Sequence, residues 1–426
     1  MVCRPRNRIT IHVPVTGSID IKPVEAIINH PFHQKSNFRK QLGLAHVAYP
    51  GAQHMRGEHE LGTYELAAQR GLRLQQAGRI NGQDIVDSKV HGLVHDDSHG
   101  PYSHITDWLV SNGHNERATQ VVQEMTDCIL ASGANPERII HMILKQDPLG
   151  QLVSHPLLGV DKLDYLARDS YHTGINGMLD IGPFLDRVDY IDGKIVVDAE
   201  IYQLVLSLLN HFWTMYDQVY FLDRVVIVER FVQRMISGLL GQTGEEQEIT
   251  EEGLLSMVDS QLDVALQSAK NPVIRKHYQR YLDGDVPVAA IVYQFDPYYR
   301  INWDSNGRTI HQPASDEVFA ERMRKPQLLH LLERELEQAL GLPKLSILVT
   351  PAAPKRRFEP PEIYFQTNSG VLHMRELDSL EWSAAQAKAR RHARFYIAVD
   401  CEHQQRIVTP SAIKEVTDIV HRHAQA

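Results

Sequence analysis

The first two thirds of the chain show apolar residues at helical spacing, after a short segment rich in β-branched residues. Residues 9–21, ITIHVPVTGSIDI, place such residues on both sides of Gly17, which predicts a hairpin leading into a helix after Pro23. Further on, apolar positions three and four residues apart, with Gly, Pro or Asn between segments, predict helices at 58–77, 83–95, 115–132, 136–146, 160–171, 199–217 and 220–240. This pattern indicates a mostly α domain.

The pattern changes near residue 285. Before it, the polar stretch 241–252, GQTGEEQEITEE, is typical of a surface loop or the start of a new helix. After it, alternating apolar positions predict strands at 345–350, 362–367, 371–376 and 393–400, and an Asn-Ser-Gly turn joins the second and third as a hairpin. We therefore expect a hairpin plus helical core over 1–285 and a smaller C-terminal α+β lobe over 286–426.

Composition limits the classes of partner. The formal net charge is −9, so we expect no general attraction to polyanions, and nucleic-acid binding is disfavoured. Cys3, Cys128 and Cys401 form no CxxC pair, which argues against a disulfide framework and a thiolate zinc site and fits a reducing cytoplasm. The sequence contains no apolar run of about 18 residues, so we expect no membrane span. Many of the histidines crowd between His30 and His172, where metal ligands and proton carriers are expected.

The segment 90–104, VHGLVHDDSHGPYSH, is the densest in candidate ligands. His95 and Asp96 are expected at the end of a helix that Gly100 and Pro101 terminate, so both side chains can turn toward one point. Mixed nitrogen and oxygen ligands suit a divalent transition ion. A lone His-Asp pair is a weak signal, however, because this dipeptide is common.

Two further residues make the signal specific. His59 precedes the pair on one predicted helix and Asp161 follows it on another, which completes an ordered set of His, His-Asp and Asp on three helices. Four such ligands leave positions on an octahedral ion for water and a phosphate oxygen, as hydrolysis requires. The structural alternatives are a surface helix histidine for His59 and a helix-capping residue for Asp161.

On these motifs the chain resembles the HD-domain deoxynucleoside triphosphate triphosphohydrolases, the family of the SAM- and HD-domain-containing protein and its bacterial relatives, here without a SAM domain. The matching phrases follow in the same order: KQLG at 40–43, YPGAQHMRGEHELG at 49–62, HDDSHGPYSH at 95–104 and VDKLDYLARDSYHTGI at 160–175. The resemblance implies one divalent ion (Mn, Fe, Mg or Zn) on the four ligands, with additional Mg accompanying the nucleotide.

The resemblance also implies roles for other residues. Those that it places against the substrate are Gln41, Leu42, Arg56, Lys162, Tyr165 and Asp169. His114 is expected to be the general acid, oriented by Glu116, while His99 and His104 stabilise charge. The alternatives are a solvated lysine, a core aromatic residue and ordinary turn histidines.

Two of the departures from the family pattern concern the metal site and the phosphate site. Asp97-Ser98 replaces the usual Leu-Gly, which is expected to add a carboxylate beside the metal. Leu222 stands where relatives carry a histidine or arginine near phosphate, so Arg224 or Arg230 would have to compensate. This second departure puts the preference for a triphosphate in doubt.

The leading hypothesis is hydrolysis of deoxynucleoside triphosphates to deoxynucleoside and inorganic triphosphate. One alternative is an HD-type phosphodiesterase or nucleotidase acting on another nucleotide, since a fold does not fix a substrate. Another is a catalytically weak nucleotide sensor. The resemblance further implies a homodimer or homotetramer with a nucleotide activator, to which the basic stretch CRPRNR at 3–8 would contribute unless it is only a solubilising tail.

Overall fold

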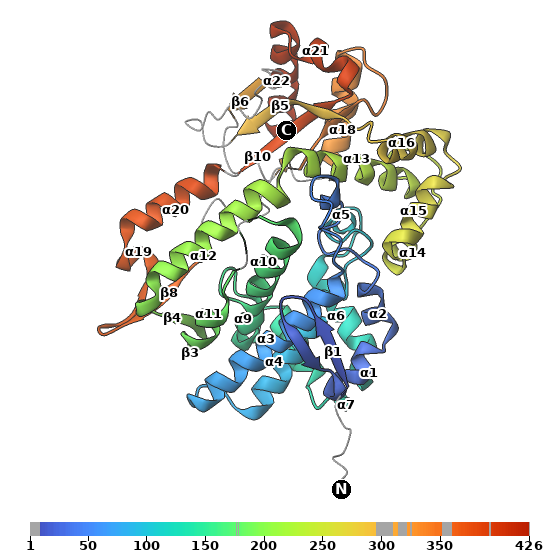
Figure 1. Cartoon of the computed structure of the whole chain (residues 1–426). Helices are drawn as coiled ribbons and strands as arrows, with labels where there is room; N and C mark the ends of the chain where they lie inside the picture. Colours follow the sequence, from blue (N-terminus) through green and yellow to red (C-terminus); the bar gives the residue numbers. More distant parts are fainter. Residues whose placement is uncertain are drawn as a thin grey trace. The chain divides into compact units, whose positions relative to one another are not determined.

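The computed structural model describes residues 9–175, 177, 179–294, 310–313, 322–323, 326–351, 360–391 and 393–425. The basic stretch at 3–8 lies outside the described residues. The chain divides into two compact units, one made of Met1–Met215, Leu255–Ser260 and Pro361–Asp378 and the other of Tyr216–Leu254, Gln261–Pro360 and Ser379–Ala426. The fold is mostly α with small sheets, as predicted (Figure 1). The domain boundary near residue 285 stays a prediction.

The first unit begins with the predicted hairpin. Strands β1 (Thr10–Val13) and β2 (Gly17–Asp20) pair antiparallel, and Gly17 at the turn has a φ of 92°, which favours glycine. Ile19 is fully buried in a core that includes residues of α3, α4 and α6, so the hairpin is packed onto the helices. The short helices η1 (Lys22–Val24), α1 (Glu25–Ile28) and α2 (Pro31–Ser36) follow.

Three helices carry the candidate site (Figure 1). They are α3 (Arg56–Gln76), α4 (Gly82–Val94) and α10 (Val160–Thr173). Asn81 caps α4 by accepting hydrogen bonds from the backbone N–H groups of Gln83 and Asp84. The helix ends at Val94 with His95 as its C-cap, so the predicted end at residue 95 is confirmed to within one residue.

The remaining helices of this unit follow the predicted order with one difference. The helix expected over 115–132 is two helices, α6 (His114–Glu124) and α7 (Thr126–Ala131), because Met125 leaves helical geometry at φ −94° and ψ 9°. Its side chain is fully buried, so the break serves the core. The others are α5 (His104–Asp107), α8 (Pro136–Ile143), η3 (Pro148–Gly150), α9 (Gln151–Ser154), α11 (Gly182–Asp186), η4 (Ala199–Ile201) and α12 (Tyr202–Met215).

A four-stranded sheet completes the first unit. It has the order β3 (Val188–Ile191), β4 (Lys194–Asp198), β8 (Tyr364–Thr367) and β9 (Gly370–His373). The Asn-Ser-Gly hairpin between β8 and β9 is confirmed, but β9 ends at His373 and helix α19 (Met374–Leu377) follows, so the predicted strand was too long. The β3–β4 hairpin was not predicted, although Asp192 and Gly193, both with positive φ, are a strong turn signal.

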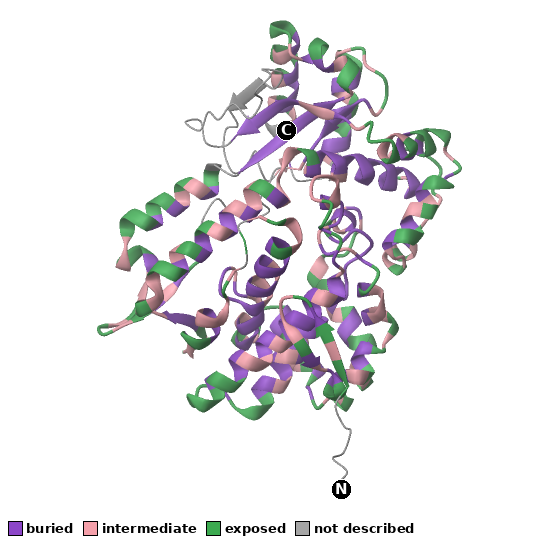
Figure 2. Cartoon of the chain, in the orientation of Figure 1, coloured by how far each residue is buried: buried purple, intermediate pink, exposed green. Residues whose placement is uncertain are grey.

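The second unit has its own sheet, with the order β6 (Ile310–Pro313), β5 (Val288–Gln294), β10 (Arg394–Val399) and β7 (Ile347–Val349). Figure 2 shows how strongly β5, β10 and helix α13 (Asp223–Leu239) are buried. Helices α18 (Pro326–Ala339) and α22 (Pro410–Gln425) contribute to the core around this sheet. The other elements are η5 (Tyr216–Tyr220), α14 (Glu251–Ser256), α15 (Asp259–Gln267), α16 (Pro272–Leu282), α20 (Ser379–Arg391), η6 (Cys401–His403) and α21 (Gln404–Ile407). Parts of α14 and α15 fall within Leu255–Ser260 and belong to the first unit.

Arg230 has a structural role in the second unit. Its guanidinium is buried and donates to both carboxylate oxygens of Glu333 at 2.9 and 3.0 Å, and to Gln233 at 2.7 Å. The expectation that Arg230 replaces a missing phosphate ligand is therefore wrong, because its donors are engaged inside the core. Arg224, the other candidate, is exposed.

Among the described residues, none of the helices combines the length and apolar character that crossing a membrane requires.

Candidate metal centre and active site

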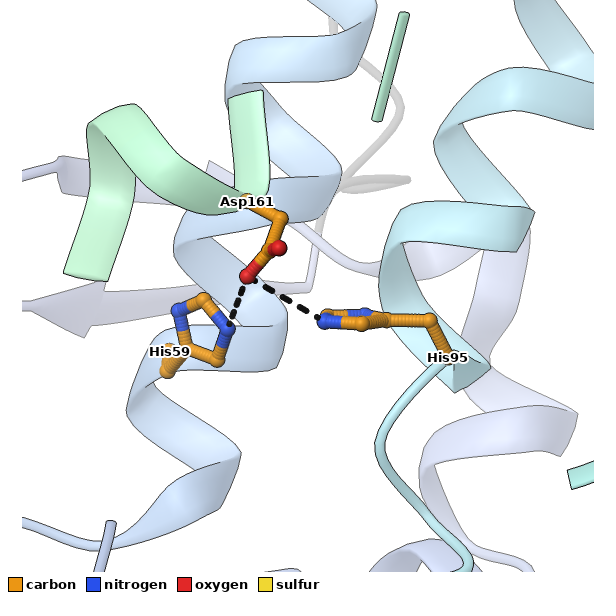
Figure 3. Close-up of side chains that lie close together, drawn as sticks. All are labelled: His59, His95 and Asp161. Atoms are coloured by element: carbon orange, nitrogen blue, oxygen red, sulfur yellow. Dashed lines mark ion pairs between the residues drawn. The ribbon is translucent and has the colours of Figure 1, made fainter. Parts of the chain in front are cut away.

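Three of the four predicted ligands meet at one point. His59 lies in α3, His95 caps the end of α4 and Asp161 is in the first turn of α10 (Figure 3). Asp161 Oδ1 is 3.3 Å from His59 Nε2 and 3.6 Å from His95 Nε2. Neither Nε2 atom has a hydrogen-bond partner among the described residues, although both are buried. Two such nitrogens facing a carboxylate fit a divalent transition ion.

Asp96, the fourth predicted ligand, lies beside this group. Its Oδ1 is 3.5 Å from His95 Nε2 and its Oδ2 is 3.8 Å from His59 Nε2. The same carboxylate forms an ion pair with Arg56. Asp96 is thus adjacent to the three predicted ligands, but its carboxylate groups most closely with His99 and His114, so its place in the ligand set stays a prediction.

The local helix geometry excludes one structural alternative for Asp161. The N-cap of α10 is Gly159, and no side chain caps this helix end. Asp161 is the second residue of the helix, and its carboxylate faces the two imidazoles. His59 is fully buried, so it is not a surface helix histidine either.

The site attracts positive charge. Burial opposes protonation of His59, but the neighbouring carboxylates of Asp161 and Asp164 raise its pKa to about 10. The pKa of His95 is also raised, against the effect of burial, by Asp96 and Asp161. Burial would raise the pKa of Asp161, yet Lys162 and the two imidazoles hold it well below the usual range. A divalent ion would replace these protons as the balancing charge.

Second-layer contacts orient both imidazoles. Asp164 Oδ2 is 2.8 Å from His59 Nδ1, and Arg168 donates to both oxygens of Asp164 at 2.9 and 2.8 Å. His95 Nδ1 donates to the carbonyl oxygen of Gly92 at 2.9 Å. In each ring Nδ1 is engaged, so Nε2 is the atom left to bind a metal. Asp164 was missed by sequence reasoning, although it lies one helical turn after Asp161.

The three predicted catalytic histidines form one cluster. His99 Nε2 is 3.1 Å from His114 Nε2 and 3.4 Å from Asp96 Oδ1, which links the cluster to the candidate metal ligands. Asp107, which was not predicted, joins the other side: its Oδ2 is 3.0 Å from His99 Nδ1 and 3.1 Å from His104 Nδ1. His104 is largely exposed, whereas His99 is buried.

His114 is the first residue of α6, as expected. Burial and the neighbouring His99 lower the pKa of His114 to about 4. Glu116 accepts a hydrogen bond from the backbone N–H of Gly113 at 3.2 Å, so its carboxylate caps the helix that carries His114. Glu116 is therefore connected to His114 through its contact with the N-terminus of α6, the helix that His114 begins.

Two predicted phosphate-binding cations flank the candidate ligands. Arg56 is buried, its Nε donates to Ser103 Oγ at 3.2 Å, and its Nη2 has no hydrogen-bond partner within the described part of the chain. Ser103 adopts a φ of 56°, a strained conformation typical of functional turns. Lys162 Nζ is 3.3 Å from Asp161 Oδ2 and 4.5 Å from the centre of the Tyr165 ring.

Gln41, one of the two predicted sugar-binding residues, is connected to His54 and through it to Asp169. The backbone N–H of Gln41 donates to the carbonyl of His54 at 3.0 Å, while Gln41 Oε1 is buried without a hydrogen-bond partner among the residues described. Leu42 is half-buried. His54 Nε2 is 2.9 Å from Asp169 Oδ1. Asp169 is thus buried against His54, and its contact with substrate stays a prediction.

Asp97 does not lie where the sequence suggested. Its Oδ1 is 3.1 Å from His33 Nδ1 and accepts a hydrogen bond from Ser36 Oγ at 3.3 Å. Glu60 completes this group. The expectation that Asp97 adds a carboxylate beside the candidate metal ligands is therefore wrong, because Asp97 contacts His33, Ser36 and Glu60 instead.

No family model matches the sequence. Among curated proteins, an uncharacterized protein of Methanocaldococcus jannaschii is 28% identical over 269 residues, which are 62% of this chain and 56% of that protein. Deoxynucleoside triphosphate triphosphohydrolase SAMHD1 of Mus musculus is 29% identical over 275 residues, covering 53% of this chain and 42% of that protein. The enzyme of the same name from Gallus gallus is 32% identical over 210 residues, covering 39% and 34%.

Two solved structures share the fold. A hypothetical protein from Aquifex aeolicus has a TM-score of 0.71 at 22% identity and covers 93% of this chain and 98% of its own. A phosphohydrolase from Bacteroides thetaiotaomicron has a TM-score of 0.70 at 21% identity and covers 92% and 100%. The predicted resemblance to the HD-domain triphosphohydrolases is confirmed by these sequence similarities. The chain spans about half the length of the curated relatives it matches.

Proposed function

We propose, from this relationship, that the chain is a metal-dependent phosphohydrolase that converts deoxynucleoside triphosphates to deoxynucleoside and inorganic triphosphate. The observation that carries the proposal is the meeting of His59 Nε2, His95 Nε2 and Asp161 Oδ1 within 3.3 to 3.6 Å, with Asp96 beside them. A divalent ion bound there would polarise a phosphate oxygen and activate water. The two unpartnered buried imidazole nitrogens fit such an ion.

The chain's own cations would position the phosphates. Arg56 Nη2 has no hydrogen-bond partner among the residues that the structure describes, and Lys162 lies over Tyr165, so both can turn donors toward an anion at the site. A planar guanidinium binds two phosphate oxygens at once, whereas an ammonium neutralises charge. Together they would hold the α-phosphate next to the metal ligands and lower the cost of charge that develops there.

The histidine cluster would handle the proton. Water adds its oxygen to the α-phosphorus, the bond from phosphorus to O5′ breaks, and O5′ takes a proton as it leaves. His114, with a pKa of about 4 in the free protein, is neutral at pH 7, but a bound triphosphate would raise its pKa. The contacts from His114 through His99 to Asp107 provide a path for the proton.

Sugar selection would come from Gln41 and Leu42. The buried Gln41 Oε1, which has no partner in the described structure, is an acceptor for a sugar hydroxyl. The half-buried Leu42 would pack where a 2′-hydroxyl would otherwise stand. We propose that this packing favours deoxynucleotides.

The second candidate is hydrolysis of another nucleotide phosphate ester. It is favoured by one observation: Leu222 stands where relatives carry a basic residue near phosphate, and the guanidinium of Arg230 is engaged by Glu333. A nucleotidase or phosphodiesterase needs fewer phosphate contacts than a triphosphohydrolase. A catalytically weak nucleotide sensor is the third candidate.

Product identification separates these candidates. Protein loaded with Mn²⁺ would be incubated with each deoxynucleoside triphosphate, alone and mixed, and the products separated by chromatography. We expect deoxynucleoside and intact triphosphate, and loss of turnover with retained nucleotide binding in Asp96→Ala. Monophosphate or orthophosphate as the product would favour the second candidate. Tight binding without turnover in the wild-type protein would favour the sensor.

We also propose that the active form is a homodimer or homotetramer and that nucleotide binding promotes it, as the resemblance implies. Sedimentation velocity with and without deoxynucleoside triphosphate would test this. A larger species that appears with nucleotide is the expected result, and a monomer under both conditions would contradict it. The proposed ion is divalent, one of Mn, Fe, Mg or Zn, because imidazole and carboxylate ligands together accept several such ions.

A further inference from the structure

A second group of potential ligands lies outside the candidate active site. It consists of His33 in α2, Glu60 in α3 and Asp97 in the turn after α4, all exposed by 1% or less. His33 Nδ1 is 3.1 Å from Asp97 Oδ1 and 3.5 Å from Glu60 Oε2. One ligand atom from each residue can be chosen so that all lie within 4.8 Å of one another. A divalent ion can therefore reach all three side chains.

Hydrogen bonds satisfy only half of these carboxylate oxygens. Ser36 Oγ lies 2.9 Å from Glu60 Oε1 and 3.3 Å from Asp97 Oδ1. Glu60 Oε2 and Asp97 Oδ2 are buried and have no hydrogen-bond partner in the described part of the protein. Buried carboxylate oxygens normally have donors, so these two atoms point to a missing positive partner.

The neighbouring arginines do not supply that partner directly. Arg39 is buried and donates to the backbone carbonyls of His99, Leu255 and Met257. Arg56 pairs with Asp96. Both guanidiniums therefore act on the buried carboxylates only by longer-range electrostatic interaction. Within the described part of the chain, His33 is thus the only basic side chain in contact with Glu60 or Asp97, and one imidazole faces two buried carboxylates.

We propose that His33, Glu60 and Asp97 bind a second divalent cation. One imidazole and two carboxylates suit Mn²⁺, Fe²⁺ or Zn²⁺, and the two negative charges balance a divalent ion. The residues alternate with those of the first site: His59 is followed by Glu60, and Asp96 by Asp97. Adjacent helical residues point about 100° apart, so the second ion would lie on another side of α3.

The second ion would be structural. All three ligands are buried, so it has no open face for a substrate. It would link α2 to α3 and to the turn that carries Asp96, and would thereby fix the position of that first-site ligand. Asp97, which departs from the Leu-Gly of the family, is one of its ligands.

Anomalous diffraction tests the site without any substitution. Crystals of the full chain grown with Mn²⁺ would be measured on both sides of the manganese absorption edge. We expect one anomalous peak among His59, His95 and Asp161, and a second among His33, Glu60 and Asp97. A peak at the first position alone, at full occupancy, would overturn the proposal. Since the peaks are separate, failure of one site is distinguishable from failure of the other.

Metal counting provides the matched test in solution. After removal of free Mn²⁺, elemental analysis should find two ions per wild-type chain and one ion in Asp161→Ala. The triple variant His33→Phe, Glu60→Leu, Asp97→Leu replaces the whole group by apolar residues and should also retain one ion. In Asp161→Ala, added Mn²⁺ should still raise the Tm. One ion in the wild-type protein and none in Asp161→Ala would overturn the proposal.

Discussion

The orientation of His59 depends on a residue that is not itself a candidate ligand. Asp164 Oδ2 lies 2.8 Å from His59 Nδ1, and Arg168 holds the same carboxylate from its other side. A carboxylate behind a ligating imidazole fixes the ring and strengthens its donor nitrogen. Asp164 would therefore act on a bound metal through His59, as a positioning residue.

Replacing Asp164 by Asn should weaken metal binding while leaving the ligand set intact. The amide can still contact His59 but carries no charge, so we expect affinity for Mn²⁺ to fall by about 10- to 100-fold. Competitive titration with a metal indicator would measure it. Asp189→Asn is the matched control, because Asp189 forms a surface ion pair with Arg79 at 2.7 Å. Equal affinity in the two variants would contradict the assigned role.

At the residue scale, the sequence predicted the candidate ligands that lie within short, recognisable motifs. His95-Asp96 is a local phrase, and His59 and Asp161 lie in phrases of their own, so the ligands could be found without contacts. Asp107 and Asp164 gave weaker signals, because acidic residues one helical turn from a histidine are common. His33 and Glu60 could not be linked to Asp97, since burial of distant polar residues against one another leaves no periodic pattern.

At the scale of elements, close packing of α3 on α10 sets the site. A methyl group added at Gly62 would overlap the carboxylate of Asp164 and the guanidinium of Arg168. Only glycine fits at this contact. The spacing of α3 and α10 near His59 and Asp161 therefore depends on Gly62, which has no side chain that could bind a metal.

Gly62→Ala should therefore damage both stability and metal binding. Overpacking in a closed core costs about 1–3 kcal/mol, and displacement of Asp164 would loosen His59. Thermal unfolding and Mn²⁺ titration would measure the two effects. Gly82→Ala in α4 is the control, because its added methyl would meet only Gln75 Nε2 at 3.4 Å. A Gly62→Ala protein with wild-type Tm and affinity would refute the packing argument.

The second unit offers a test of buried charge in α18. Burial raises the pKa of Glu337 to about 7 from the ordinary 4.5, against the opposing charge of Arg234. Between these values the folded protein binds more protons than the unfolded chain, so its free energy of unfolding falls as pH rises through the window. Well above pH 7, where Glu337 is deprotonated in both states, the free energy of unfolding falls no further through this group.

Glu337→Gln removes this titration and keeps an acceptor for the backbone N–H of Ile347, which lies 3.4 Å from Glu337 Oε1. We expect the Tm of the variant, relative to the wild-type protein, to be higher at pH 8 than at pH 5. Calorimetry at both values would measure it. A Tm difference that does not change with pH would show that the carboxyl group is not perturbed.

The elements themselves show which signals are reliable. Long helices such as α3 and α10 follow from their apolar period, and the β8–β9 hairpin follows from its turn residues. The end of α4 at Val94, with His95 as its C-cap, was predicted to within one residue. The β3–β4 hairpin was overlooked, although its Asp-Gly turn is a strong signal, because it lies inside a stretch dominated by helices.

At the scale of the whole molecule, local sequence patterns do not predict which distant strands pair with one another. Strand β8 pairs parallel with β4, joining Tyr364 to Val196, so part of the chain after residue 286 completes a sheet in the first unit. The general class, a helical core with smaller sheets, was predictable. The interleaving of the two units was not, because no local periodicity records a pairing across so long a separation.

The central claim concerns the whole protein: its metal centre directs water to the α-phosphorus of a deoxynucleoside triphosphate. A single turnover of the Mn²⁺-loaded protein in H₂¹⁸O, followed by mass spectrometry of both products, tests it most directly. The account predicts one ¹⁸O atom in inorganic triphosphate and none in the deoxynucleoside. Label in orthophosphate or pyrophosphate, or no metal-dependent release of any product, would contradict it.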